Sequence, residues 1–192
     1  MKMRLKHYPT MLLMIVAAST LVTPASADNI GAITMTCGAC HGANGIATNN
    51  DWPSLAGQKS GYLLDQLRAF KSGSRQNILM ANLLDSMSEQ DLQDIAAHYA
   101  SLPFKVIPAT TINENGRNVR AACISCHGMN GNTVNDTWPN LAGQNQGYLL
   151  QQLKNFSAGD RESVIMNVIA SELNEQQMTD VAEYFEQIGS QQ

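Results

Sequence analysis

Two pentapeptides of the form Cys-x-x-Cys-His, Cys37–His41 and Cys123–His127, are the residues of this chain best suited to chemistry. Two thiols at this spacing can add across the two vinyl groups of a haem, and the adjacent imidazole then becomes the proximal ligand of the iron. The copies lie 86 positions apart. They predict two covalently bound haem c groups, held by the following cysteines and histidines: Cys37, Cys40 and His41 in the first copy, and Cys123, Cys126 and His127 in the second.

Three other uses of paired cysteines explain the pattern less well. A disulfide between cysteines separated by two residues closes a tight loop that constrains little, and it leaves the following histidine unexplained. A thioredoxin-like dithiol needs a preceding strand, and no strand pattern precedes either copy. Zinc held by the two cysteine pairs is a minor alternative. Haem attachment is therefore the preferred interpretation.

The chain begins like an exported precursor. A basic start and an apolar stretch over residues 11–22 precede the small-x-small sequence Ala25-Ser26-Ala27, which is typical of a signal peptide. The apolar stretch is shorter than the roughly 20 residues that a spanning helix needs. We therefore expect a signal peptide over residues 1–27, cleavage after Ala27, and a periplasmic mature chain without a transmembrane segment.

Charge limits the class of partner. The leader holds three of the 12 lysine and arginine residues and none of the 16 acidic residues, so cleavage leaves a net charge of −7. An acidic chain is a poor partner for nucleic acid. The sign is compatible with redox partners that present a basic patch.

The chain is a tandem duplication. A shift of 86 positions aligns the two halves without an insertion and superimposes, for example, Trp52-Pro53 on Trp138-Pro139. Pro103 and Pro108 lie between the halves and disfavour helix there. The predicted organisation has three parts: a first domain over residues 28–102, a linker over residues 103–108 and a second domain over residues 109–192.

Each half reads as helices and loops, with no alternating strand pattern. Apolar spacing predicts helices over residues 61–72 and 147–158. In the last helix of the first half, we expect Ser88 as the N-cap and Asp91 as the third helical residue. The apolar stripes of the two last helices are Leu92, Ile95, Ala96 and Tyr99, and Met178, Val181, Ala182 and Phe185. Because only nine residues separate Ala27 from Cys37, we expect a short opening helix.

The duplication also selects candidate distal iron ligands among the six methionines that follow the leader. Only Met80 and Met166 occupy equivalent positions, each 39 residues after its proximal histidine. His98 is the alternative, but its counterpart is Tyr184, so it could serve one haem only. We therefore expect His/Met ligation of both irons, which raises the reduction potential relative to harder donors.

Further pairs of residues are candidates for contacts around the haems. Pro53 and Pro139 each lie 12 residues after the proximal histidine, where a backbone carbonyl could accept the imidazole Nδ1–H and increase its basicity. The tryptophans before them either donate a hydrogen bond to a haem propionate or pack in the core. Two arginines either neutralise propionates or face solvent. These residues are Trp52, Trp138, Arg75 and Arg161.

Together these features resemble the cytochrome c4 family, the tandem di-haem class I c-type cytochromes of bacterial periplasms. The likeness rests on both Cys-x-x-Cys-His-Gly sites, both Pro-x-Leu-Ala-Gly-Gln-x-x-x-Tyr-Leu stretches, and a methionine before each final helix. It implies an all-α fold of two tandem cytochrome c domains, related by a pseudo-twofold axis, each wrapped around one covalent haem. The ligands of the family map onto His41, Met80, His127 and Met166.

The resemblance further implies an electron carrier, not an enzyme. It would pass single electrons between respiratory donors and a terminal oxidase, a membrane-bound cytochrome complex or another periplasmic redox protein. One alternative is the cytochrome subunit of a periplasmic dehydrogenase, such as flavocytochrome c sulfide dehydrogenase. A second is a di-haem peroxidase-like enzyme, which needs an open or displaceable iron site and is disfavoured by the matched Met80 and Met166.

Overall fold

The computed structural model describes residues 27–104 and 111–190. The expected leader therefore lies outside the described residues except for Ala27, and the same holds for residues 105–108 of the expected linker. Within the described ranges all regular structure is helical, and none of these helices is long and apolar enough to cross a membrane.

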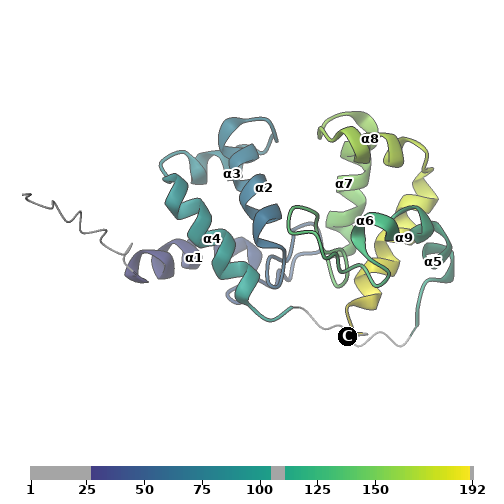
Figure 1. The fold of residues 1–192 in the computed structure, drawn as a ribbon, viewed down its shortest axis with the longest axis horizontal. Helices are drawn as coiled ribbons and strands as arrows, with labels where there is room; N and C mark the ends of the chain where they lie inside the picture. Colours follow the sequence, from purple (N-terminus) through teal and green to yellow (C-terminus); the bar gives the residue numbers. More distant parts are fainter. Residues whose placement is uncertain (1–26, 105–110, 191–192) are drawn as a thin grey trace, which may run out of the picture.

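Two helical halves stand side by side, with α2 of the first half and α7 of the second nearest the middle (Figure 1). The first half contains α1 (Ala27–His41), α2 (Ser60–Ser72), α3 (Ile78–Leu84) and α4 (Glu89–Ser101). The second half contains α5 (Glu114–Val119), η1 (Arg120–Ala122), α6 (Ile124–His127), α7 (Gln146–Ala158), α8 (Val164–Ser171), α9 (Glu175–Gln187) and η2 (Ile188–Ser190). The all-α, two-domain expectation is confirmed.

Each half has its own apolar core, built mainly by its middle and last helices. In the first half, Leu63 and Leu67 of α2 pack against the stripe of α4. In the second half, Leu149 of α7 packs against the corresponding stripe of α9. All eight stripe residues expected from the sequence are buried. Burial of these apolar side chains is the main stabilising contribution in domains of this size.

The starts of α4 and α9 follow the expected capping pattern. The Ser88 side chain accepts a hydrogen bond from the Asp91 backbone N–H, and the Asp91 carboxylate accepts one from the Ser88 N–H. Asn174 and Gln177 form the equivalent reciprocal pair in α9. These bonds satisfy N–H groups that the first turn of a helix leaves without an intrahelical partner.

The opening helix differs from the expectation. α1 is 15 residues long and runs without a break through the first cysteine pair to His41, because nothing in that stretch interrupts the helix before Gly42. Gly42 has a φ of 82°, and a Cβ there would lie 2.0 Å from the Ile46 carbonyl oxygen. The segment of the second half that corresponds to α1 is divided into three short helices, α5, η1 and α6. The expectation of a short first helix was therefore wrong.

The capping pair of α4 gives a test of stability. We expect Ser88→Ala to lower the free energy of unfolding by about 1 kcal/mol, because the Asp91 N–H loses its acceptor. Denaturant unfolding followed by circular dichroism measures the change. Ser86→Ala is the matched control, since Ser86 is exposed and precedes the cap. An equal loss in the two variants would contradict the capping role.

Candidate haem sites and domain interface

Each proximal histidine is oriented by a backbone carbonyl. His41 Nδ1 lies 2.9 Å from the Pro53 carbonyl oxygen, and His127 Nδ1 lies 2.9 Å from that of Pro139. A carbonyl oxygen can only accept, so Nδ1 of each ring carries the proton and Nε2 keeps its lone pair. This is the tautomer that can coordinate a metal through Nε2.

Burial favours the uncharged forms of the histidines and of the first cysteine in both motifs. Burial lowers the pKa of His41 and of His127, against the opposing effect of the proline carbonyls. Burial likewise raises the pKa of the Cys37 thiol and raises that of Cys123 to about 11. All four cysteines are free thiols. The sites thus present neutral imidazoles and unpaired thiols, which are the groups that a covalent haem needs.

The two candidate methionine ligands lie at the same position of two short helices. Met80 is the third residue of α3, and its N–H donates to the side chain of the N-cap Asn77. Met166 is the third residue of α8, and its N–H donates to the N-cap Ser163. The Met80 side chain also packs against the first core. Figure 1 shows α3 and α8 at the same end of the two halves.

The two tryptophans differ in their exposure to solvent. Trp52 is 38 % exposed, and its carbonyl accepts a hydrogen bond from the Asn145 side chain of the other half. Trp138 is half-buried. No described residue accepts a hydrogen bond from either indole.

The two arginines meet at the interface between the halves. Arg75 donates to Gln66 of its own half, and to Tyr148 and Gln152 of the second half, at 2.7–3.0 Å. Arg161 makes the mirror-image set of bonds, to Gln152, Tyr62 and Gln66, at 2.7–3.1 Å. Each guanidinium also lies over a phenylalanine of its own half. The arginines therefore join the halves instead of facing bulk solvent.

This network holds two positive charges without a negative one. Arg161 is only 9 % exposed, and within residues 27–104 and 111–190 no carboxylate accepts a hydrogen bond from either guanidinium. Burial opposes ionisation of the Tyr148 phenol, but Arg75 and Arg161 outweigh it and bring its pKa below the usual value. Buried charges are normally paired. An anionic group such as a haem propionate fits this environment.

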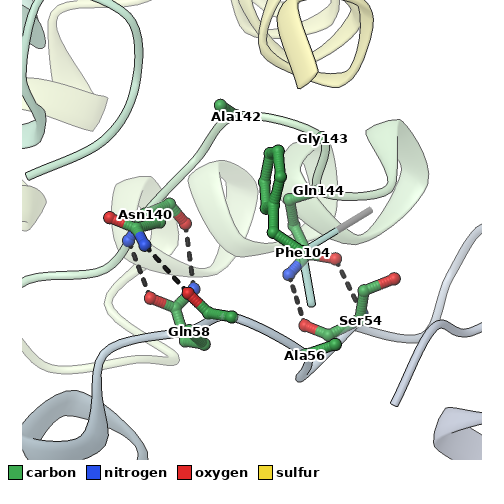
Figure 2. Close-up of a pocket in the computed structure, with 9 residues that line it drawn as sticks. Ser54, Ala56, Gln58, Phe104, Asn140, Ala142, Gly143 and Gln144 are labelled. Atoms are coloured by element: carbon green, nitrogen blue, oxygen red, sulfur yellow. Dashed lines mark hydrogen bonds between the residues drawn. The ribbon is translucent and has the colours of Figure 1, made fainter. Parts of the chain in front are cut away.

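Sequence reasoning missed the side chains that join the two proximal loops. The Gln58 side chain is hydrogen-bonded to the backbone N–H and carbonyl of Asn140. The Gln144 side chain is hydrogen-bonded to the backbone N–H and carbonyl of Ser54 (Figure 2). Asn145 also reaches across, to the carbonyls of Ala47, Asn49 and Trp52. The repeated Leu-Ala-Gly-Gln sequence was the available signal, but repetition alone does not reveal a contact between the copies.

The described residues contain no group of three or more His, Cys, Asp or Glu side chains arranged to hold a metal ion.

Comparison with known proteins gives consistent matches over both halves. The cytochrome c family model matches residues 31–103 and again residues 114–189. Cytochrome c4 of Pseudomonas aeruginosa is 34 % identical over 165 residues, covering 78 % of this chain and 82 % of the relative. The thiosulfate dehydrogenase electron acceptor of Stutzerimonas stutzeri is 32 % identical, covering 82 % and 81 %. The crystal structure of reduced recombinant cytochrome c4 from Pseudomonas stutzeri matches with a TM-score of 0.78 and 31 % identity, covering 85 % of this chain and 99 % of that one.

The interface network gives a second test. We expect Tyr148→Phe to reduce the free energy of unfolding by about 1 kcal/mol, because Arg75 loses one of its acceptors across the interface. Tyr62→Phe should have a similar effect through Arg161. Denaturant unfolding of the haem-loaded protein measures both.

Tyr184→Phe is the control for removal of a phenol hydroxyl. Tyr184 is buried, and its hydroxyl makes no hydrogen bond to the described residues. A loss in Tyr184→Phe as large as that in Tyr148→Phe would contradict a specific role for the interface hydroxyls.

Proposed function

Because the chain belongs to the cytochrome c family, and within it to the cytochrome c4 group, we propose that it is a periplasmic carrier of single electrons from respiratory donors to a terminal oxidase or another periplasmic acceptor. The chain is a di-haem c-type cytochrome with one covalent haem in each half. Each haem, when bound, supplies an iron that alternates between the ferric and ferrous states. The paired proximal sites and their shared interface carry the proposal.

We assign the iron ligands as His41 with Met80 and His127 with Met166. The support for the histidines is the oriented Nδ1–H, which leaves Nε2 of each ring for coordination. The support for the methionines is their equivalent placement after the N-caps of α3 and α8. With a histidine and a methionine bound to each iron, neither iron needs to exchange a ligand when its oxidation state changes. This arrangement suits electron transfer better than catalysis.

The two interface arginines suit a role in holding propionates. Arg75 and Arg161 lie at the interface with neutral partners, so a propionate from either haem would pair a charge that is otherwise uncompensated. Trp52 and Trp138 remain candidates for a propionate contact, since no described residue accepts from their indole N–H groups. Arginine–propionate pairs of this kind would place both haems close to the interface.

Export and domain limits are part of the same proposal. A leader over residues 1–27, cleaved after Ala27, would deliver the chain to the compartment in which the proposed partners lie. Domains over residues 28–102 and 109–192 agree with the two separate cores. The proposed linker is not independent of the second domain, since Phe104 packs against the second core.

Apolar side chains around the methionines offer a surface for partners. On α3, Ile78 is 73 % and Leu79 is 66 % exposed, and on α8, Val164 is 93 % and Val168 is 63 % exposed. An apolar patch set in an acidic protein suits brief association with a redox partner whose own apolar patch has a basic rim.

A dedicated electron acceptor of a dehydrogenase is the second candidate function. Its support is the relative named thiosulfate dehydrogenase electron acceptor, which matches nearly as well as cytochrome c4. The two functions differ in partner and not in haem chemistry. Affinity purification of the tagged native protein distinguishes them: a stoichiometric dehydrogenase favours the second function, and rapid oxidation by oxidase-containing membranes without such a complex favours the first.

Replacement of the methionines tests the ligand assignment. We expect Met80→Ala and Met166→Ala each to abolish the ferric methionine–iron charge-transfer band of one haem and to lower the potential of that haem, because a thioether ligand stabilises the ferrous iron. Spectroelectrochemical titration measures both effects.

Met35→Ala is the control, since Met35 is 78 % exposed and has an alanine at the equivalent position of the repeat. Persistence of both bands in Met80→Ala or in Met166→Ala would overturn the corresponding ligand, and a high-spin haem in the unmodified protein would favour the enzyme alternative.

A further inference from the structure

The peptide group that follows each proline has a hydrogen-bond partner on both of its sides. In the first half, the Pro53 carbonyl accepts from His41 Nδ1, and the N–H of the same peptide, that of Ser54, donates to Gln144 Oε1 at 2.8 Å. In the second half, the Pro139 carbonyl accepts from His127, and the Asn140 N–H donates to Gln58 Oε1 at 2.7 Å.

Each glutamine comes from the opposite half and is itself held in place. Gln144 Nε2 donates back to the Ser54 carbonyl at 2.8 Å, and Gln58 Nε2 donates to the Asn140 carbonyl at 2.9 Å. Figure 2 shows the two amides in this paired arrangement on either side of Phe104. Gln58, Gln144 and Ser54 are all less than 9 % exposed. These bonds are therefore largely shielded from bulk water.

A hydrogen bond at the N–H of a peptide group changes the basicity of its carbonyl oxygen. The peptide C–N bond is conjugated with its carbonyl, so an acceptor at the N–H draws electron density toward the carbonyl oxygen. Hydrogen bonds in such a chain strengthen one another. A more basic carbonyl pulls harder on the imidazole Nδ1–H, which makes the ring a stronger electron donor to a bound metal. A stronger donor stabilises ferric over ferrous iron.

We propose that Gln58 and Gln144 are positioning residues that lower the reduction potential of the haem in the opposite half, by polarising the Pro139–Asn140 and Pro53–Ser54 peptides. The proposal rests on the assigned ligation by His41 and His127. The tuning is crossed: a residue of the second half acts on the first haem, and a residue of the first half acts on the second haem.

The coupling has a reciprocal consequence. If docking of the two halves favours the ferric state of a haem by some factor, reduction of that haem weakens the docking by the same factor. The halves are therefore held together slightly more firmly in the oxidised protein than in the reduced protein. Denaturant unfolding of both redox forms, compared between the unmodified protein and Gln144→Met, gives an independent readout of this difference.

Gln144→Met tests the proposal in the haem-loaded protein, because methionine has a similar length but no strong acceptor. We expect the reduction equilibrium constant of the first haem to increase about threefold, which is about 28 mV because a tenfold change corresponds to 59 mV for one electron. The reduction potential of the second haem should shift less. Gln58→Met should reverse this pattern. The Met80→Ala and Met166→Ala spectra assign each potential to its haem.

The hyperfine-shifted Nδ1–H resonance of the proximal histidine gives a second readout by proton NMR. In Gln144→Met, we expect the His41 Nδ1–H to exchange faster with solvent, because its acceptor is weaker. The His127 Nδ1–H should be unchanged. A purely structural role of the glutamine would not confine the change to the opposite half.

Asn145→Ala is the matched control, since it is neutral, crosses the same interface and removes bonds to the same loop without touching the Pro53–Ser54 peptide. Asn145→Ala should change the reduction potential of the first haem by only a small fraction of the shift seen in Gln144→Met. Equal shifts in these two variants, equal shifts of both haems in Gln144→Met, or no shift at all would each overturn the proposal. Absence of a hyperfine-shifted histidine would instead overturn the ligation on which it rests.

Discussion

The hydrogen bond from each proximal imidazole to a proline carbonyl depends on a chain of contacts that begins in the core. The Gly57 N–H donates to the carbonyl of Tyr99, a fully buried residue of α4, and the Gly143 N–H donates to that of Phe185 in α9. These bonds hold the loop that contains the proline. The loop then orients the imidazole, so the apolar stripe of the last helix determines the direction of a ligand that lies about sixty residues earlier in the sequence.

The interface between the halves is polar, and its polarity has a physical reason. Two arginines, two tyrosines and two glutamines meet there in a crossed arrangement, with no carboxylate among their described partners. Arg161 is buried and Arg75 is half-buried, and positive charges removed from water are costly unless anions accompany them. Haem propionates would provide those anions, so cofactor attachment and docking of the halves are expected to stabilise one another.

The sequence predicted features that depend on neighbouring residues within one helix and features that recur in both halves. The capping pairs at Ser88 and Asn174 and the stripes of α4 and α9 follow from spacing within one helix. α3 and α8 were missed because such short helices have little periodicity, although Asn77 and Ser163 are N-caps that could have indicated them. The partners of Arg75 were not predictable, since alignment of the repeats shows equivalent positions but not how one copy docks on the other.

The docking also makes the two sites unequal although their ligands are of the same types. Asn145 is the N-cap residue of α7, and its side chain holds the first loop at the carbonyls of Ala47, Asn49 and Trp52. Its repeat counterpart is Lys59, whose side chain donates no hydrogen bond to the described residues of the second half. The loop beside His41 is therefore held across the interface by more bonds than the loop beside His127. With asparagine at this position in one half and lysine in the other, the duplicated chain has two loops of different rigidity.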